Sequence, residues 1–139
     1  MIEYNFETDF DLDDKQGISA WISNVIATEG FILGEINYIF CDDDYLHKLN
    51  VEFLDHNTLT DIISFDYSVG KELRGDVFIS IDRVRDNAKA FKVNFTEELH
   101  RVIVHGILHF CGFKDKTDKD AELMRQKENR YLGQRIDNP

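Results

Sequence analysis

Proline is almost absent from this sequence, which contains a single one at position 139. Because proline interrupts helices and is common in linkers, its scarcity argues against an internal linker. Internal repeats and low-complexity segments are lacking as well. We therefore expect residues 1–139 to form a single domain, which is long enough to enclose one hydrophobic core.

Cysteines and long apolar runs are also scarce. The two cysteines, Cys41 and Cys111, are too few for a disulfide framework, and we expect both to be free thiols. No stretch approaches the roughly 20 apolar residues that a membrane-spanning helix needs. The first ten residues, MIEYNFETDF, are acidic and unlike a signal peptide. These features predict a cytoplasmic protein with no membrane partner.

Positive charge is in deficit, with 16 Lys and Arg against 27 Asp and Glu and a formal net charge of −11. Such a chain repels polyanions at long range, which excludes a general nucleic-acid coating protein. Contact with RNA would need a bound cation, a partner or a local basic patch. The candidates for that patch are Lys71, Arg74, Lys89, Lys92, Lys114 and Lys116.

Apolar periodicity predicts an α+β fold, with a mixed sheet of about four strands and about five helices. Strands are expected at residues 2–6, 34–41, 59–67 and 75–81. The first helix follows a cap at Asp13 or Asp14, the second opens at residues 42–44, and the third spans 82–91. A fourth begins after Asn94 or Thr96 and stops at Gly112, and a fifth covers about 118–135. The fourth is apolar on most of its circumference, so we expect it to be central and buried.

The segment HGILHFCGFKD, residues 105–115, places two histidines four residues apart on this central helix. That spacing turns both imidazoles to one face, about 6 Å apart along the axis. Gly112 then lets the chain turn back and bring in Asp115. Two nitrogens and one oxygen, with a fourth position open, are typical of a hydrolytic zinc site, although other divalent ions accept the same donors. We predict His105, His109 and Asp115 as metal ligands and as the catalytic centre.

Most single buried histidines are hydrogen-bonded core residues without a metal. Two on one apolar helix are harder to satisfy in that way, which favours a metal. The other candidate ligands fit ordinary roles better. Cys111 is expected to pack against the core, His100 to be exposed, and His47 and His56 to lie at the surface.

Gly106 separates this motif from that of the metzincin peptidases, which it otherwise resembles in spacing. Those enzymes carry a glutamate base directly after the first histidine. Glycine cannot take a proton, and inside a helix it costs about 1 kcal/mol relative to alanine. Close packing against a neighbouring element, or space for a substrate, would offset that cost. The usual peptidase chemistry is therefore excluded.

The motif HG-x-LH-x-x-G, with a third ligand ten residues after its first histidine, resembles the YbeY family of bacterial rRNA-maturation endoribonucleases. Further matches cover roughly residues 34–132 and comprise Leu49 and Asn50, the segment TDIISF at 60–65, Gly75 and Asp76, and Ala121, Met124 and Glu128. The resemblance implies a zinc-dependent, single-strand-specific endoribonuclease acting in maturation of the 16S rRNA 3′ end and in ribosome quality control. It implies the small ribosomal subunit as partner, with ribosomal proteins or an assembly GTPase as further candidates.

Two positions depart from the family pattern. The third ligand, usually histidine, is Asp115 here, which is still a competent zinc ligand. The arginine that the family usually carries five residues after the leucine of its Leu-Asn pair is replaced by Leu54. Arg74, Lys114 or Arg101 would have to supply the missing positive charge.

The leading hypothesis is hydrolysis of an RNA phosphodiester at the metal centre. Asp61 and Asp76 are candidates to orient the ligands, and Arg74, Lys89 and Lys114 are candidates to contact RNA. Two alternatives remain open. One is a ribosome-assembly factor that binds through a structural metal, and the other is a metallohydrolase with a substrate other than RNA.

Overall fold

The computed structural model describes residues 1–55 and 59–137, with the side chains of 136 and 137 left aside; His56 lies outside this part. Within it, four strands form one sheet in the order β1-β2-β4-β3. β1 pairs with β2 and β2 with β4 in parallel, whereas β3 runs antiparallel to β4. The sheet is therefore mixed, as predicted. The strands are β1 (Ile2–Phe6), β2 (Ile32–Cys41), β3 (Ile62–Asp66) and β4 (Glu72–Ser80).

Five helices accompany the sheet in the described part of the chain, which also confirms the prediction. They are α1 (Lys15–Thr28), α2 (Asp43–Leu54), α3 (Ile81–Phe91), α4 (Phe95–Phe110) and α5 (Asp118–Asp137). Side-chain oxygens accept hydrogen bonds from the first turns and decide where helices begin. The caps include Asp14 for α1, Asp42 for α2, Ser80 for α3 and Asn94 for α4.

β4 begins three residues earlier than the alternation of its side chains indicated. The chain turns back on itself after β3, and the Tyr67 N–H donates to the Arg74 carbonyl at 2.8 Å. Val69 and Glu72 exchange two further backbone bonds. Glu72 and Leu73 also pair with Ile32 and Leu33 of β2, so a strand distant in the sequence extends β4 beyond the residues whose alternation predicts it.

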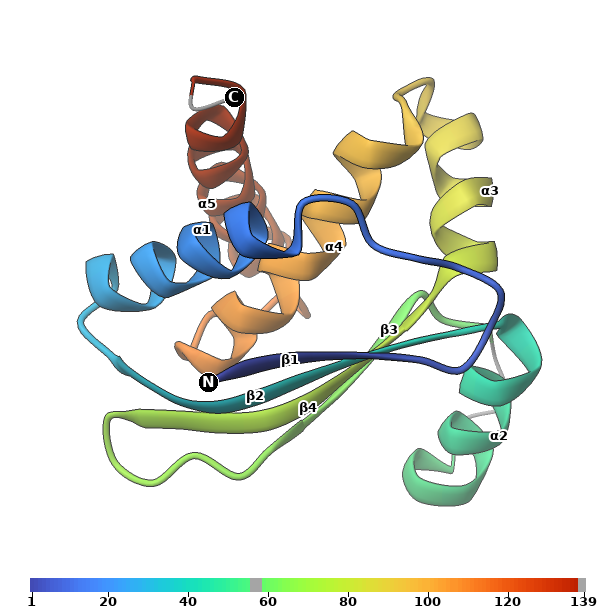
Figure 1. Cartoon of the computed structure of the whole chain (residues 1–139), viewed down its shortest axis with the longest axis horizontal. Coiled ribbons are helices and arrows are strands. Elements are labelled where there is room, and N and C mark those ends of the chain that lie inside the picture. Colours follow the sequence, from blue (N-terminus) through green and yellow to red (C-terminus); the bar gives the residue numbers. More distant parts are fainter. Residues whose placement is uncertain (56–58, 138–139) are drawn as a thin grey trace.

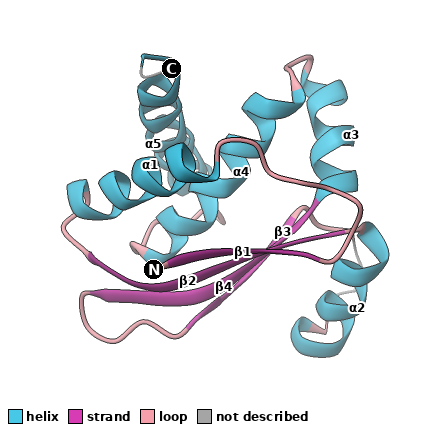
Figure 2. Cartoon of the chain, viewed as in Figure 1, coloured by secondary structure: helices cyan, strands magenta, loops and turns pink. Residues whose placement is uncertain are grey.

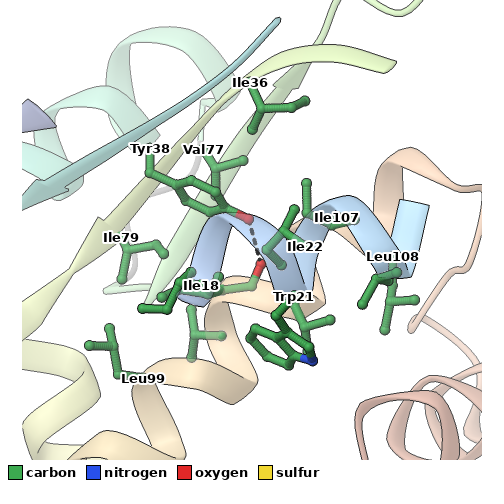
Figure 3. Packing of buried hydrophobic residues seen from close by; sticks show 14 of the residues in the cluster. Ile18, Trp21, Ile22, Ile36, Tyr38, Val77, Ile79, Leu99, Ile107 and Leu108 are labelled. Carbon is green, nitrogen blue, oxygen red and sulfur yellow. Dashed lines mark hydrogen bonds between the residues drawn. The ribbon is translucent and has the colours of Figure 1, made fainter. Parts of the chain in front are cut away.

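Helices α1 and α4 pack on the upper face of the sheet as Figure 1 shows it, and α2 packs against β3 and β4 from the opposite face. The colouring of Figure 2 shows the same division between the strands and the helices above them. Between the sheet and the helices α1 and α4 lies the main apolar core, drawn in part in Figure 3, which contains Ile18 and Ile22 of α1 and Val77 of β4. The Tyr38 hydroxyl donates to the Ile103 carbonyl at 2.9 Å, which ties β2 to α4 (Figure 3).

α4 has many buried residues. Its buried residues are Glu98, Leu99, Val102, Ile103, Val104, Gly106, Ile107, Leu108 and Phe110. The predicted exposure of His100 is wrong, because the ring packs against Trp21 with centroids 5.9 Å apart. Burial, assisted by the positive charge of Arg135, lowers the pKa of His100 to about 4. Helices α1 and α5 cover the side chain of His100. The position of His100 around its own helix gives no indication of these distant neighbours.

In the part of the chain that the structure describes, no helix is long and apolar enough to cross a bilayer.

Candidate metal centre and cleft

The three predicted ligands meet at the C-terminal end of α4. His105 Nε2 lies 2.9 Å from His109 Nε2 and 3.2 Å from Asp115 Oδ2, and His109 Nε2 lies 3.4 Å from the same oxygen. Gly112 makes this possible, since its φ of +98° lies in a region that side chains disfavour and lets the chain turn back after the helix. The sequence pattern thus correctly predicted which donors come together.

Hydrogen bonds on the far side of each ring leave both Nε2 atoms free to bind a cation. His109 Nδ1 lies 2.9 Å from the Phe113 carbonyl, which can only accept, so Nδ1 carries the proton. His105 Nδ1 likewise donates to Glu128 Oε2 at 2.7 Å. With neutral rings, two nitrogen lone pairs and the Asp115 carboxylate then face one another with no hydrogen between them. A bound cation would remove the repulsion between these lone pairs and the carboxylate.

The spacing of the three donors fits a tetrahedral ion. Zinc bound at about 2.0–2.1 Å from each ligand separates neighbouring ligand atoms by about 3.3 Å. The three observed distances lie between 2.9 and 3.4 Å. A metal ion thus fits this donor set with little movement of the side chains, and a fourth position remains for water or substrate.

Charges around the site support this geometry. Burial opposes protonation of His105, but its hydrogen bond to Glu128 and the nearby carboxylates outweigh burial and raise the pKa of His105. Burial would raise the pKa of Glu128, yet its hydrogen bonds to His105 and Arg101 lower it. The raised pKa of His105 and the lowered pKa of Glu128 reflect one strong interaction, in which the buried carboxylate orients the imidazole.

We expect zinc affinity to fall as the pH is lowered from 8 to 6. Protons compete with zinc for Nε2, and because the pKa of His105 is raised above 6.5, this competition begins above that pH. Each displaced proton changes the apparent Kd by about tenfold per pH unit below the pKa. Calorimetric titration in buffers of different ionisation enthalpy measures both the Kd and the released protons. An affinity that is constant from pH 6 to 8 would contradict this assignment of the ligands.

The metal centre opens into a cleft of about 540 Å³. α4 forms its floor, and α3 and α5 lie on either side of α4 (Figure 1). α3, β3 and the residues just before β3 provide one wall, with Asn87 and Asp61, while α5 provides the other, with Arg125 and Glu128. Asp61 lines the cleft and accepts a hydrogen bond from Asn87 at 3.4 Å, and burial raises its pKa. On the floor, burial also raises the pKa of Glu98.

Several predicted residues do not reach the cleft. Asp76 extends from the opposite face of β4 to Val77, because side chains alternate along a strand, and it accepts a hydrogen bond from Asn37 at 3.1 Å. Arg74 is exposed on the same outer face and pairs with Glu72. The exposed Lys89 and Lys114 are likewise absent from the cleft lining.

Leu54, at the position where the family usually carries arginine, is exposed at the end of α2 and does not line the cleft. Arg101 does line it, as one of the three replacements that the sequence proposed. Arg125 is a second arginine in the lining, and no motif in the sequence marks it.

The packing around Gly106 explains why this position carries no glutamate base of the kind that the peptidases use. A Cβ atom at this position would lie 3.0 Å from Val77 Cγ1 and 3.1 Å from Ile62 Cδ1. The helix therefore packs tightly against β3 and β4, which is one of the two explanations that the sequence allowed. There is no room for a glutamate side chain directed away from the helix here.

Glu128 is the main functional residue that sequence reasoning left without a role. It was noted only as part of a matching helix, although its side chain is 7% exposed. The signal was a carboxylate on the same face of α5 as Met124 and Tyr131, because a charge on an apolar face needs a partner. Cys111 packs against the core as predicted, and burial raises the pKa of its thiol to about 12.

The family model for endoribonuclease YbeY matches residues 3–135, nearly the whole chain. The chain belongs to the endoribonuclease YbeY family. The endoribonuclease YbeY of Flavobacterium johnsoniae is 64% identical over 132 residues, which are 95% of each chain. That of Flavobacterium psychrophilum is 56% identical over 132 residues, 95% of this chain and 94% of the relative.

A solved structure shows the same fold. TM1509 from Thermotoga maritima, determined in solution, matches with a TM-score of 0.70 and 25% sequence identity over 100% of this chain and 94% of that chain. The resemblance to the YbeY family, and with it the predicted class of enzyme, an endoribonuclease, is thereby confirmed.

Proposed function

We propose that this YbeY-family chain hydrolyses single-stranded RNA at a metal ion held by His105, His109 and Asp115. The observation that carries the proposal is the cluster of three ligand atoms, each within 3.4 Å of the others, in the lining of a cleft of about 540 Å³. Zinc is the ion that best suits two imidazoles and a carboxylate, and other divalent metals remain compatible.

A bound zinc ion lowers the pKa of water to about 7 and polarises a phosphoryl oxygen. The protein groups prepare that chemistry. Glu128 holds His105 Nδ1, so that Nε2 points to the ion, and the Phe113 carbonyl does the same for His109. The carboxylates of Asp61 and Glu98 line the cleft with raised pKa values, which suits them to accept a proton during attack on the phosphate.

The proposed substrate is the precursor of the small-subunit rRNA, near the 16S 3′ end, processed in the cytoplasm. A net charge of −11 opposes general binding to RNA, so recognition has to be local. Ribosomal proteins or an assembly GTPase would supply the remaining contacts. In this proposal residues 1–139 act as one domain.

A second candidate function is a ribosome-assembly factor whose metal is purely structural. Two observations favour it: the acidic composition, and the exposed Leu54 at the position of the family arginine. A hydrolase acting on a substrate other than RNA is compatible with the same charge.

Cleavage assays on a labelled single-stranded RNA and on its duplex separate these functions. The metal-free protein is expected to be inactive, and one equivalent of zinc is expected to restore cleavage of the single strand only. Binding of the RNA without cleavage at any metal loading would favour the assembly factor. Neither binding nor cleavage, in a protein that holds one zinc ion, would leave only the hydrolase with another substrate.

A further inference from the structure

The cleft contains more negative than positive groups, although its proposed substrate is an anion. Four carboxylates line it: Asp61, Glu98, Asp115 and Glu128. Among the described lining residues, the only permanently charged cations are Arg101 and Arg125. RNA can enter such a cleft only if a cation beside the metal is available to a phosphate oxygen.

The two arginines differ in how firmly they are held. Arg101 is 17% exposed, and its Nη1 lies 2.9 Å from Glu128 Oε1, so this guanidinium is occupied in neutralising a buried carboxylate. Arg125 is 56% exposed, and its Nη1 is 3.7 Å from the same oxygen, beyond hydrogen-bonding distance. Glu128 is thus satisfied by Arg101 and His105, and Arg125 remains available to bind a substrate.

The opposite wall carries an exposed aromatic ring. Phe91, the last residue of α3, is 58% exposed and yet lines the cleft. Exposing a large apolar side chain to water is unfavourable, and a flat, apolar group that covers the Phe91 ring would remove this cost. A nucleobase of a single strand offers such a surface, whereas the bases of a duplex are already stacked on one another.

We propose that Arg125 and Phe91 are two substrate-binding residues on opposite walls, Arg125 for a backbone phosphate and Phe91 for an unpaired base. The inference rests on the proposed RNA substrate and adds to it the residues that bind the strand. Arg125 from α5 then supplies the cation that α2, ending in Leu54, does not provide.

The test for Arg125 compares Arg125→Gln with Arg130→Gln. Arg130 is a matched control on the same helix, exposed and outside the cleft lining. The readouts are kcat/KM for a single-stranded RNA and the salt dependence of binding to a 2′-O-methyl analogue that is not cleaved. Arg125→Gln is expected to lower kcat/KM by about 10- to 100-fold, the value of a charged hydrogen bond. The slope of log affinity against log salt should fall by about 0.7, as for one lost phosphate contact.

The test for Phe91 compares Phe91→Leu with Phe53→Leu, since Phe53 is equally exposed at 59% but lies on α2 outside the cleft lining. Loss of stacking is expected to weaken binding of the analogue by about 5- to 100-fold without changing the salt slope. Phe91→Trp, which keeps an aromatic ring, should bind the analogue as tightly as wild type. An analogue with an abasic site at the stacked position should bind wild type more weakly than the intact analogue does. The same abasic site should not weaken binding to Phe91→Leu any further.

Zinc affinity and melting temperature serve to exclude misfolding, and both should match wild type in all variants. An unchanged salt slope in Arg125→Gln, with active wild type, overturns the role of Arg125 alone. Binding by Phe91→Leu equal to that of wild type overturns the role of Phe91 alone. Wild type that neither binds nor cleaves RNA overturns the proposed function, and this inference with it.

Discussion

Replacing His109 by alanine is expected to abolish both stoichiometric zinc binding and RNA cleavage. The substitution removes one of three ligands and leaves His105 and Asp115, too few to hold zinc in a catalytic site. Since the bound ion contributes several kcal/mol to the stabilisation of the transition state, activity should fall by at least about 1000-fold. Zinc content measured by mass spectrometry and single-turnover cleavage of RNA report the two effects separately.

His47→Ala is the matched control for this loss, because His47 lies on α2 and does not line the cleft. It should retain one zinc ion and full activity. Asp115→His, which replaces the carboxylate by the ligand usual in the family, should also retain zinc, since imidazole is an equally suitable donor. One equivalent of zinc in His109→Ala, bound as tightly as in wild type, would refute the assignment of the metal centre.

Replacing Glu128 by alanine is expected to weaken zinc binding and the fold at the same time. His105 would lose the acceptor that orients it, which typically costs 10- to 100-fold in metal affinity. Arg101, only 17% exposed, would lose its counter-charge, and breaking a buried ion pair costs about 3–5 kcal/mol. Urea unfolding of the metal-free protein measures the stability term, and zinc titration measures the affinity term.

Glu122→Ala provides the control, because Glu122 is exposed on the same helix and outside the cleft lining. It should change the free energy of unfolding by less than about 0.5 kcal/mol. Glu128→Gln should have a stability and a zinc affinity between those of Glu122→Ala and Glu128→Ala. Its amide oxygen still accepts a hydrogen bond from His105, but the amide offers Arg101 no charge. If Glu128→Ala were as stable as wild type and bound zinc equally well, Glu128 would neither orient His105 nor stabilise the fold through Arg101.

Local signals in the sequence predicted most of the fold. Ile18, Trp21 and Ile22 recur at helical spacing, and they form the buried face of α1. Asp14, Asp42 and Asn94 cap the helices near which they were expected. Such features act over a few residues, so they can be read from the chain alone. The early start of β4 and the partial burial of His100 depend on segments that are distant in the sequence, and these were missed.

The sequence by itself determined the ligand cluster, since a helical repeat of four residues and a glycine turn bring His105, His109 and Asp115 together wherever the helix lies. Only the tertiary structure decided what surrounds them. The packing of α5 against α4 brings Glu128 to His105 across 23 residues and places Arg125 in the cleft. The face of β4 on which Asp76 lies removes it from the site. Helix geometry links neighbours along the chain, but charges meet across a cleft only after the core has packed.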